Sequence, residues 1–305
     1  MIKAQRPSTL KLYASYIKRW MEFSNANGYD FLEPTVPQGL AFLHFLFSEG
    51  NRKYTTLNTA RSALSLLISI PEGKFGEHRD VIRFMKGINQ IKPTLPRYID
   101  TWDPDLVLNL FKTWSPAVNL SLELLTYKTV VLLLLVSGRR PQIIRNLNVE
   151  RMKISGNSFT FIFQQTDLKE GRVNFKPEPL KVKKYPADKR LCIYKYLTEY
   201  LKKTLEIRGA EKSFFLTTQK PHTQPSADSV SRWIKTVLNH AGVDTSHFKP
   251  GSTRAASNSK ALRQGTPINE IMRNAGWSRE STFTKYYKKP LTKPDEFSNN
   301  VLGEE

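Results

Sequence analysis

The chain has 305 residues, of which 39% are hydrophobic and 11% are aromatic, so it is long enough for two domains with separate cores. It carries 47 lysines and arginines against 27 acidic residues, a formal charge of +20, and basic residues are in excess both before and after residue 98. This distribution excludes a short basic tail as the source of the charge. It favours a polyanionic partner, most simply nucleic acid, that contacts the chain over a long surface.

Three classes of protein are disfavoured by the remaining composition. Cys192 is the only cysteine, which excludes a disulfide framework and favours a reducing compartment. The five histidines show no zinc-ligand spacing, so we expect no metal and no other cofactor. The apolar run at residues 129–136 is much shorter than the ~20 residues that a membrane span needs, and we expect no membrane contact.

The first 95 residues predict a helical domain without strands. Aromatic residues recur at helical spacing from Ser8 to Gly28. Further helices are expected at residues 37–47, 55–70 and 79–90, each bounded by glycine, proline or polar residues. Five basic residues are candidates for one DNA-facing surface on these helices, although a solvated helix face explains any single one equally well: Lys18, Arg19, Arg52, Lys53 and Arg61.

Two prolines within residues 91–100 predict a linker, taken as residues 96–103, because proline disfavours helix at the residue before it. A second domain is expected at residues 104–290, followed by a C-terminal tail at residues 291–305. Asp103 and Pro104 are typical of a helix start, and an apolar helix is expected at residues 121–137.

The middle of the second domain predicts a small β region. Residues 158–163 alternate as in a half-buried strand, residues 166–172 form a polar turn, and residues 173–182 are expected to be extended and irregular. Helices follow at residues 192–208, 229–240, 253–263, 267–275 and 281–287. The predicted fold is therefore mainly α with a small β-sheet or hairpin (α+β).

The second domain supplies in order the side chains that phosphodiester exchange requires. A nucleophile must attack phosphorus, the added negative charge must be neutralised, and the departing 5′ oxygen must receive a proton. Tyrosine suits the first task, arginine the second because its planar fork pairs with two phosphate oxygens, and lysine the third. The motifs are Ser137-Gly138-Arg139-Arg140, Lys169, Ser252-Thr253-Arg254, Gly276-Trp277 and Tyr286-Tyr287.

In this order the motifs resemble those of the tyrosine recombinase (phage-integrase-like) family over nearly the whole chain. The resemblance implies a helical core-binding domain at residues 1–95 and a catalytic domain at residues 104–290. It implies that Arg140 and Arg254 are the two catalytic arginines and that Lys169 is the hairpin lysine that protonates the leaving oxygen. It also implies that Trp277 contacts the phosphate through its indole N–H. Arg139 and Lys249 are expected as further DNA contacts.

Finer similarities are to the recombinases of DIRS-type retrotransposons, at residues 137–140, 252–261 and 275–290. In that subgroup the nucleophile lies directly before a basic-proline ending, which favours Tyr287. Gap-free counting in bacterial members of the family favours Tyr286. We predict Tyr287, and only one of the two can reach the phosphate because adjacent helical residues point to different sides.

Two positions depart from the family's pattern. Gly251 stands where the family usually has a histidine that positions or deprotonates the nucleophile, and His247 and Lys249 are candidates to replace it. Ile143 stands where an acidic residue often orients the first arginine. Taken singly, each motif also has an ordinary explanation; two arginines after an apolar helix, for example, are typical of a helix C-terminus.

The resemblance implies a site-specific recombinase or integrase of a mobile element that uses no cofactor. Its expected partner is double-stranded DNA, on which it would act as a homotetramer, in the nucleus if the host is eukaryotic. Two rival functions share the fold. One is a catalytically impaired, domesticated DNA-binding protein, and the other is a type IB topoisomerase-like enzyme.

Overall fold

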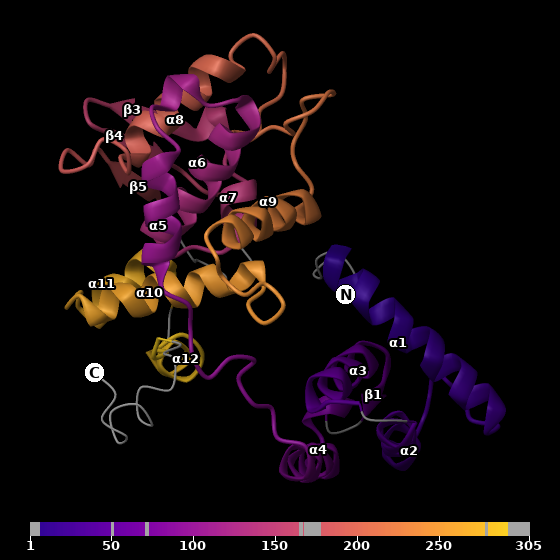
Figure 1. Cartoon of the computed structure of the whole chain (residues 1–305). Helices are drawn as coiled ribbons and strands as arrows, with labels where there is room; N and C mark the ends of the chain where they lie inside the picture. Colours follow the sequence, from indigo (N-terminus) through magenta and orange to yellow (C-terminus); the bar gives the residue numbers. More distant parts are fainter. Residues whose placement is uncertain are drawn as a thin grey trace, which may run out of the picture. The chain divides into compact units, whose positions relative to one another are not determined.

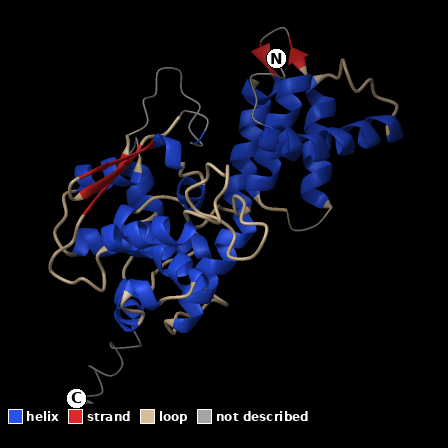
Figure 2. Cartoon of the chain, turned by 90° about the horizontal axis from the view of Figure 1, so that it is seen from above, coloured by secondary structure: helices blue, strands red, loops and turns tan. Residues whose placement is uncertain are grey.

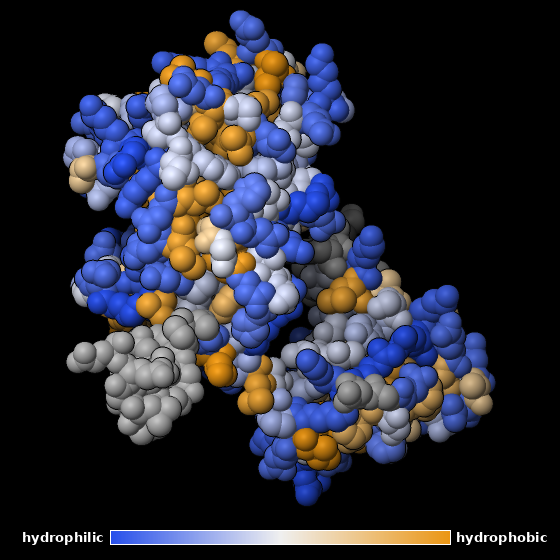
Figure 3. All heavy atoms as spheres, viewed as in Figure 1, coloured by the Kyte–Doolittle hydropathy of each residue, from blue (hydrophilic) through white to orange (hydrophobic). Residues whose placement is uncertain are grey.

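The computed structural model describes residues 7–49, 52–70, 73–164, 167, 178–277 and 280–291. It divides into two compact units, Met1–Leu95 and Pro96–Glu305 (Figure 1). Each unit buries a hydrophobic core of its own, and helices dominate both (Figure 2). Hydrophilic residues cover most of the face shown in Figure 3.

The first unit is a small helical bundle centred on the fully buried Trp20, whose Nε1 donates to the carbonyl of Phe31 at 3.0 Å. Its helices are α1 (Pro7–Ala26), α2 (Val36–Ser48), α3 (Tyr54–Leu67) and α4 (Arg79–Ile91). Helix α2 begins with a capping box, in which Thr35 and Gln38 satisfy each other's backbone N–H groups.

A short hairpin in this unit contradicts the expectation of a domain without strands. Strand β1 (Ser69–Ile70) pairs antiparallel with β2 (Gly73–Lys74), and a 3-10 turn, η2 (Phe75–Glu77), follows. Two-residue strands are too short to show the alternation that predicts a strand, so the pattern gave no signal.

The basic residues expected to contact DNA from this unit lie on α1, on α3 or directly before α3. Lys18 and Lys53 are exposed, whereas Arg19, Arg52 and Arg61 are half-buried. Helices α1 and α3 pack against each other, so these residues belong to neighbouring elements. Whether they contact DNA stays a prediction.

The second unit is arranged around α6 (Leu122–Ser137), which packs against α5, α8, α9 and α10. Because α6 is surrounded, its apolar side chains are spread around the helix and it shows no separate polar face. The surrounding helices are α5 (Pro104–Thr113), α7 (Pro141–Arg145), α8 (Ile193–Thr204), α9 (Ala227–His240), α10 (Thr253–Arg263), α11 (Ile268–Ala275) and α12 (Glu280–Tyr286). The described connections between these elements include the 3-10 turns η3 (Ala117–Asn119), η4 (Val149–Arg151) and η6 (Pro250–Ser252).

The β region is a three-stranded antiparallel sheet of order β3-β4-β5. Its strands are β3 (Met152–Ser155), β4 (Ser158–Phe161) and β5 (Leu180–Lys183). Phe159 and Phe161 of β4 face the core, opposite Val182 and Leu180 of β5. The sequence predicted β4 and an extended segment at β5, but it did not predict β3.

A lysine with no exposed surface holds three elements of this core together. Lys128 of α6 donates from Nζ to the carbonyls of Phe111 (2.5 Å) and Trp114 (2.6 Å) and to the Tyr196 hydroxyl (2.6 Å). The contacts therefore join α6 to the end of α5 and to α8. Burial lowers the pKa of Lys128 to about 7, while the three acceptors favour its charged form.

We expect Lys128→Met to lower the free energy of unfolding by about 1–3 kcal/mol, because the carbonyls of Phe111 and Trp114 lose the ammonium as a donor. The folded-state pKa of about 7 lies below the ordinary 10.5, so between these pH values the unfolded chain binds more protons than the folded one. The stability of the wild type relative to the variant should therefore rise with pH across this window. Chemical denaturation at both ends of the window measures it, with Lys153→Met, at an exposed lysine of β3, as control. A stability difference that stays constant with pH would contradict the assignment.

Candidate active site

The site begins where α6 ends, because its last turn is bound to α10. Gly138 adopts a left-handed φ of 60° at the C-cap, and a Cβ there would lie 2.6 Å from Oδ1 of Asn258. The Asn258 amide donates to the carbonyls of Arg254 (2.7 Å) and Gly138 (3.3 Å), and the Ser257 hydroxyl donates to the carbonyl of Leu135. Two motifs far apart in the sequence thereby lie side by side.

A guanidinium, an indole and a phenol form the centre of the site. The Arg254 Cζ lies 4.2 Å from the centroid of the Trp277 ring and 5.3 Å from that of Tyr287. The two rings are themselves 4.6 Å apart. Arg254 is only 2% exposed and Trp277 only 8%, so the cation–π contacts form away from water, where they are strongest.

The indole N–H of Trp277 is a hydrogen-bond donor for which the described residues supply no acceptor. Its Nε1 is buried and has no hydrogen-bond partner among them. Gly276, with a φ of 73°, ends α11 and turns the chain so that the indole reaches Arg254. Because buried donors are almost always satisfied, this N–H is suited to an oxygen of a bound anion.

The two tyrosines differ sharply in environment. Tyr286 is 41% exposed and its ring contacts the Lys285 ammonium, with Nζ 5.3 Å from the centroid. Tyr287 lies in the cluster with Arg254 and Trp277. The Ser259 hydroxyl donates to the Tyr287 carbonyl at 2.5 Å and accepts from the Lys289 N–H at 3.0 Å, which holds the segment against α10.

The paired arginines after α6 are also placed differently. The Arg139 side chain is 5% exposed, and Nη1 lies 3.0 Å from the position that a Cβ on Gly276 would occupy. Arg140, the N-cap of α7, is half-buried, and its side chain makes no hydrogen bond or ion pair with the residues that the structure describes. Arg139 is therefore the one of the two that directly contacts the Gly276–Trp277 turn. The motif alone could not show this.

The position at which a histidine was expected is open. Gly251 is exposed on η6, and apart from its chain neighbours no described residue places an atom within 4 Å of the point where its Cβ would be. His247 lies 3.7 Å from the Asp100 carboxylate, and the Lys249 ammonium donates to the carbonyls of Thr245 and Ser246. Among the described residues, His247 and Lys249 thus make these contacts with residues other than Tyr287.

Several supporting residues gave no signal in the sequence. The Trp102 indole donates to the Ser252 hydroxyl at 2.9 Å, and the Thr101 N–H donates to the Pro290 carbonyl at 2.8 Å. Ile143, which replaces the expected acidic residue, is 6% exposed and packs in the main core. These contacts join residues more than one hundred positions apart, which no local pattern reports.

Three further expectations concern Lys169, a metal site and a membrane span. Lys169 lies outside the described residues, between β4 and β5. No group of histidine, cysteine or carboxylate side chains suited to a metal occurs among the described residues. Within the same residues, no helix combines the length and apolar character needed to cross a bilayer.

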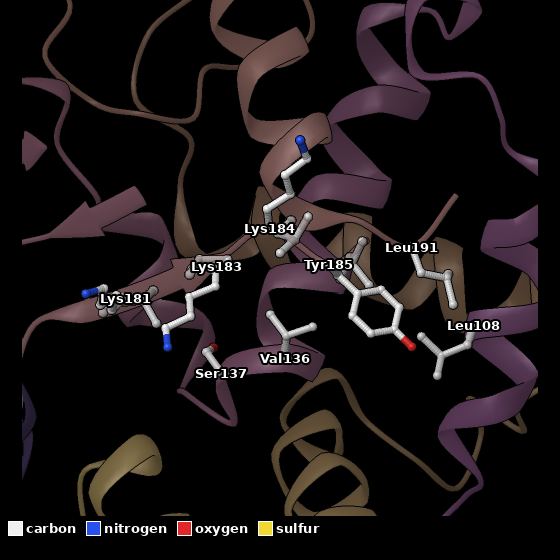
Figure 4. A pocket seen from close by; sticks show the side chains of 12 residues that line it. Leu108, Val136, Ser137, Lys181, Lys183, Lys184, Tyr185 and Leu191 are labelled. Atoms are coloured by element: carbon white, nitrogen blue, oxygen red, sulfur yellow. The ribbon is translucent and has the colours of Figure 1, made fainter. Parts of the chain in front are cut away.

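A pocket of about 390 Å³ opens beside the end of α6 (Figure 4). Lys181 and Lys183 lie at one end of it, and Leu108 and Tyr185 lie at the other. Its lining includes Ser137 but none of Arg254, Trp277 and Tyr287, so this pocket is distinct from the aromatic cluster.

Comparisons with known proteins agree on one fold. The model of the phage integrase family matches residues 115–292. A lambda integrase dimer bound to a COC′ core site has a TM-score of 0.55 and 17% identity, covering 95% of this chain and 74% of that one. The Tn1549 transposon integrase in complex with transposon right end DNA has a TM-score of 0.55 and 13% identity, and the match covers 97% of this chain and 99% of that one. XerH recombinase bound to its difH substrate has a TM-score of 0.54 and 11% identity, and the match covers 88% of this chain and 69% of that one. Among curated proteins, none matches the chain.

Proposed function

Because the chain belongs to the phage integrase family, we propose that it cleaves and rejoins double-stranded DNA through a 3′-phosphotyrosyl intermediate, as a site-specific recombinase or integrase. The observation that carries the proposal is the cluster of Arg254, Trp277 and Tyr287. It places a permanent cation and an unused N–H donor beside a phenol. This is the combination that attack on a phosphodiester requires.

The proposed reaction assigns one task to each side chain. The Tyr287 oxygen attacks phosphorus, the bond from phosphorus to the 5′ oxygen breaks, and a 3′-phosphotyrosyl ester forms. Arg254 and Arg140 neutralise the added charge, and the Trp277 N–H binds a phosphate oxygen. Lys169 gives its proton to the leaving 5′ oxygen, and the phenol proton passes to water. Rejoining reverses these steps with a new 5′-hydroxyl as nucleophile.

The motifs similar to those of DIRS-type recombinases support integration of a mobile element, in the nucleus if the host is eukaryotic. One lambda integrase structure is a tetramer bound to a Holliday junction, which supports a tetramer of this chain on two DNA sites. The formal charge of +20 supports binding dominated by phosphate contacts, which weakens steeply with salt.

A pool of nicked DNA duplexes of random sequence tests the proposal. Cleavage next to a nick releases a short fragment, so a covalent protein–DNA adduct accumulates and survives denaturant. The absence of any adduct across a range of salt concentrations would contradict the proposed cleavage activity. Relaxation of supercoiled plasmids irrespective of their sequence would instead support the type IB topoisomerase-like activity.

A DNA-binding protein without the chemistry is the second candidate, and the open position at Gly251 favours it. Retention of duplex DNA that falls with salt, combined with the absence of an adduct, would support it. Lys18, Arg19, Arg52, Lys53 and Arg61 are then the proposed contacts from the helical unit, with Lys249 from the second unit.

We expect Gly251→His to raise the rate of adduct formation by up to about 10²-fold, the lower end of what a positioned base supplies. The side chain has room, since none of the residues described by the structure, chain neighbours aside, lies within 4 Å of the Cβ position. The gain should appear as pH rises through the ordinary imidazole pKa near ~6.5. Single-turnover cleavage measured against pH checks this, with Gly251→Ala as the matched control. An equal gain in the alanine variant would show that the imidazole is not responsible.

A further inference from the structure

Arg139 touches three segments that are remote from one another in the sequence. Its Nη2 donates to the Glu178 carbonyl at 3.4 Å, and its Cζ lies 5.8 Å from the centroid of the Phe163 ring. Its Nη1 lies against Gly276, 3.0 Å from where a Cβ would be. With only 5% of its surface exposed, Arg139 has little access to a ligand in solution.

Two of these contacts are at the base of one hairpin. Phe163 follows β4 and Glu178 precedes β5, so they mark the points where the chain leaves the sheet and returns to it. The third contact is the turn that carries Trp277. A single planar guanidinium thus bridges the hairpin base and the turn, by a hydrogen bond, a ring contact and close packing.

The Gly276 backbone permits this bridge. Its φ of 73° suits glycine, and a Cβ there would press within 3.0 Å of the guanidinium. Because Gly276 has no side chain, its backbone can approach the Arg139 guanidinium closely.

We propose that Arg139 is a positioning residue that holds the hairpin base against the Gly276–Trp277 turn. The inference rests on the proposed function, in which the hairpin carries the proton donor. By fixing the hairpin base, Arg139 sets the distance between that donor and the phosphate bound beside Trp277. It acts on departure of the leaving group and does not itself bind DNA.

Replacement of the leaving oxygen by sulfur tests this assignment. In a duplex with a bridging 5′ sulfur at the cleavage site, Tyr287 attacks phosphorus, the phosphorus–sulfur bond breaks, and a thiolate leaves. The thiolate needs no proton, because a thiol has a pKa of about 8.5, far below that of an alcohol. The site for the substitution is taken from the adduct that the wild type forms with ordinary DNA.

We expect Arg139→Met to cleave the oxygen substrate about 100-fold more slowly than the wild type, as a misplacement of about 1 Å would cause. On the sulfur substrate most of this loss should disappear, and the Kd for duplex DNA should stay unchanged. Arg139→Lys keeps the charge but not the planar fork, so its smaller loss on oxygen should also be rescued by sulfur. It is the second variant if Arg139→Met melts at too low a temperature.

Arg208→Met is the matched control. The Arg208 guanidinium also donates to backbone carbonyls, those of Ser213 and Phe214, but in a different part of the unit. Its loss should lower the melting temperature without changing the ratio of the two cleavage rates. Equal losses of Arg139→Met on oxygen and sulfur, or no loss on either, would overturn the assignment. Failure of the wild type to react with either substrate would instead overturn the proposed function.

Discussion

Tyr287→Phe is expected to abolish the covalent protein–DNA adduct, whereas Tyr286→Phe is expected to retain it. Loss of a nucleophile lowers turnover on the order of 10⁶-fold, so no adduct should be measurable. Tyr287 packs against Trp277 and Arg254, while Tyr286 is 41% exposed and contacts Lys285. Phenylalanine keeps the ring and hence the packing at either position, so the comparison isolates the hydroxyl.

Peptide mapping of the adduct measures the same assignment directly, since one peptide carries the nucleotide mass. Thermal melting of both variants controls for folding, and similar melting temperatures are expected. An adduct formed by Tyr287→Phe but not by Tyr286→Phe would transfer the role to Tyr286. The cluster would then be a packing feature.

Arg254→Lys is expected to slow cleavage by about 10³-fold, the upper end of the effect of losing one preorganised donor to a transition-state anion. Lysine keeps the charge but loses the planar fork and the stacking on the indole, which lies 4.2 Å from the guanidinium carbon. Retention of duplex DNA should change little, because Arg254 is only 2% exposed and contributes one of many cations.

Single-turnover cleavage and a binding titration on the same duplex separate the two effects. Lys260→Met is a suitable control, since Lys260 lies on the same helix but forms an ion pair with Asp105. If Arg254→Lys cleaved at the wild-type rate, Arg254 would have no role in the reaction. A variant that loses binding and cleavage in equal proportion would make it an ordinary DNA contact.

Long elements with a clear period were predictable from the sequence, and short ones were not. The predicted helix at residues 253–263 has the same bounds as α10, and the apolar run before Gly138 gave α6 to within a residue. The strands β1, β2 and β3 and the five-residue helix α7 were not predicted. Each is too short for hydrophobic periodicity to separate it from a loop.

The site could be predicted only as a set of motifs. Their order indicates which residues belong together, but it does not indicate which member of a pair points inward. The structure places Arg139 against Gly276, and it places Tyr287 against Trp277, because local backbone turns decide the direction of neighbouring side chains. Supports such as Asn258 and Ser259 bind main-chain carbonyls, a role that leaves no mark in residue spacing.

The hydrogen bonds of Thr101 and Trp102 have a practical consequence for trimming the protein. Both residues follow Pro96 closely in the sequence. Thr101 binds Pro290, three residues after Tyr287, and Trp102 binds Ser252, two residues before Arg254. A fragment that starts at Pro104, where the first helix of the second unit begins, would lack both ties. The shortest fragment of the second unit that folds by itself should therefore include residues 96–103.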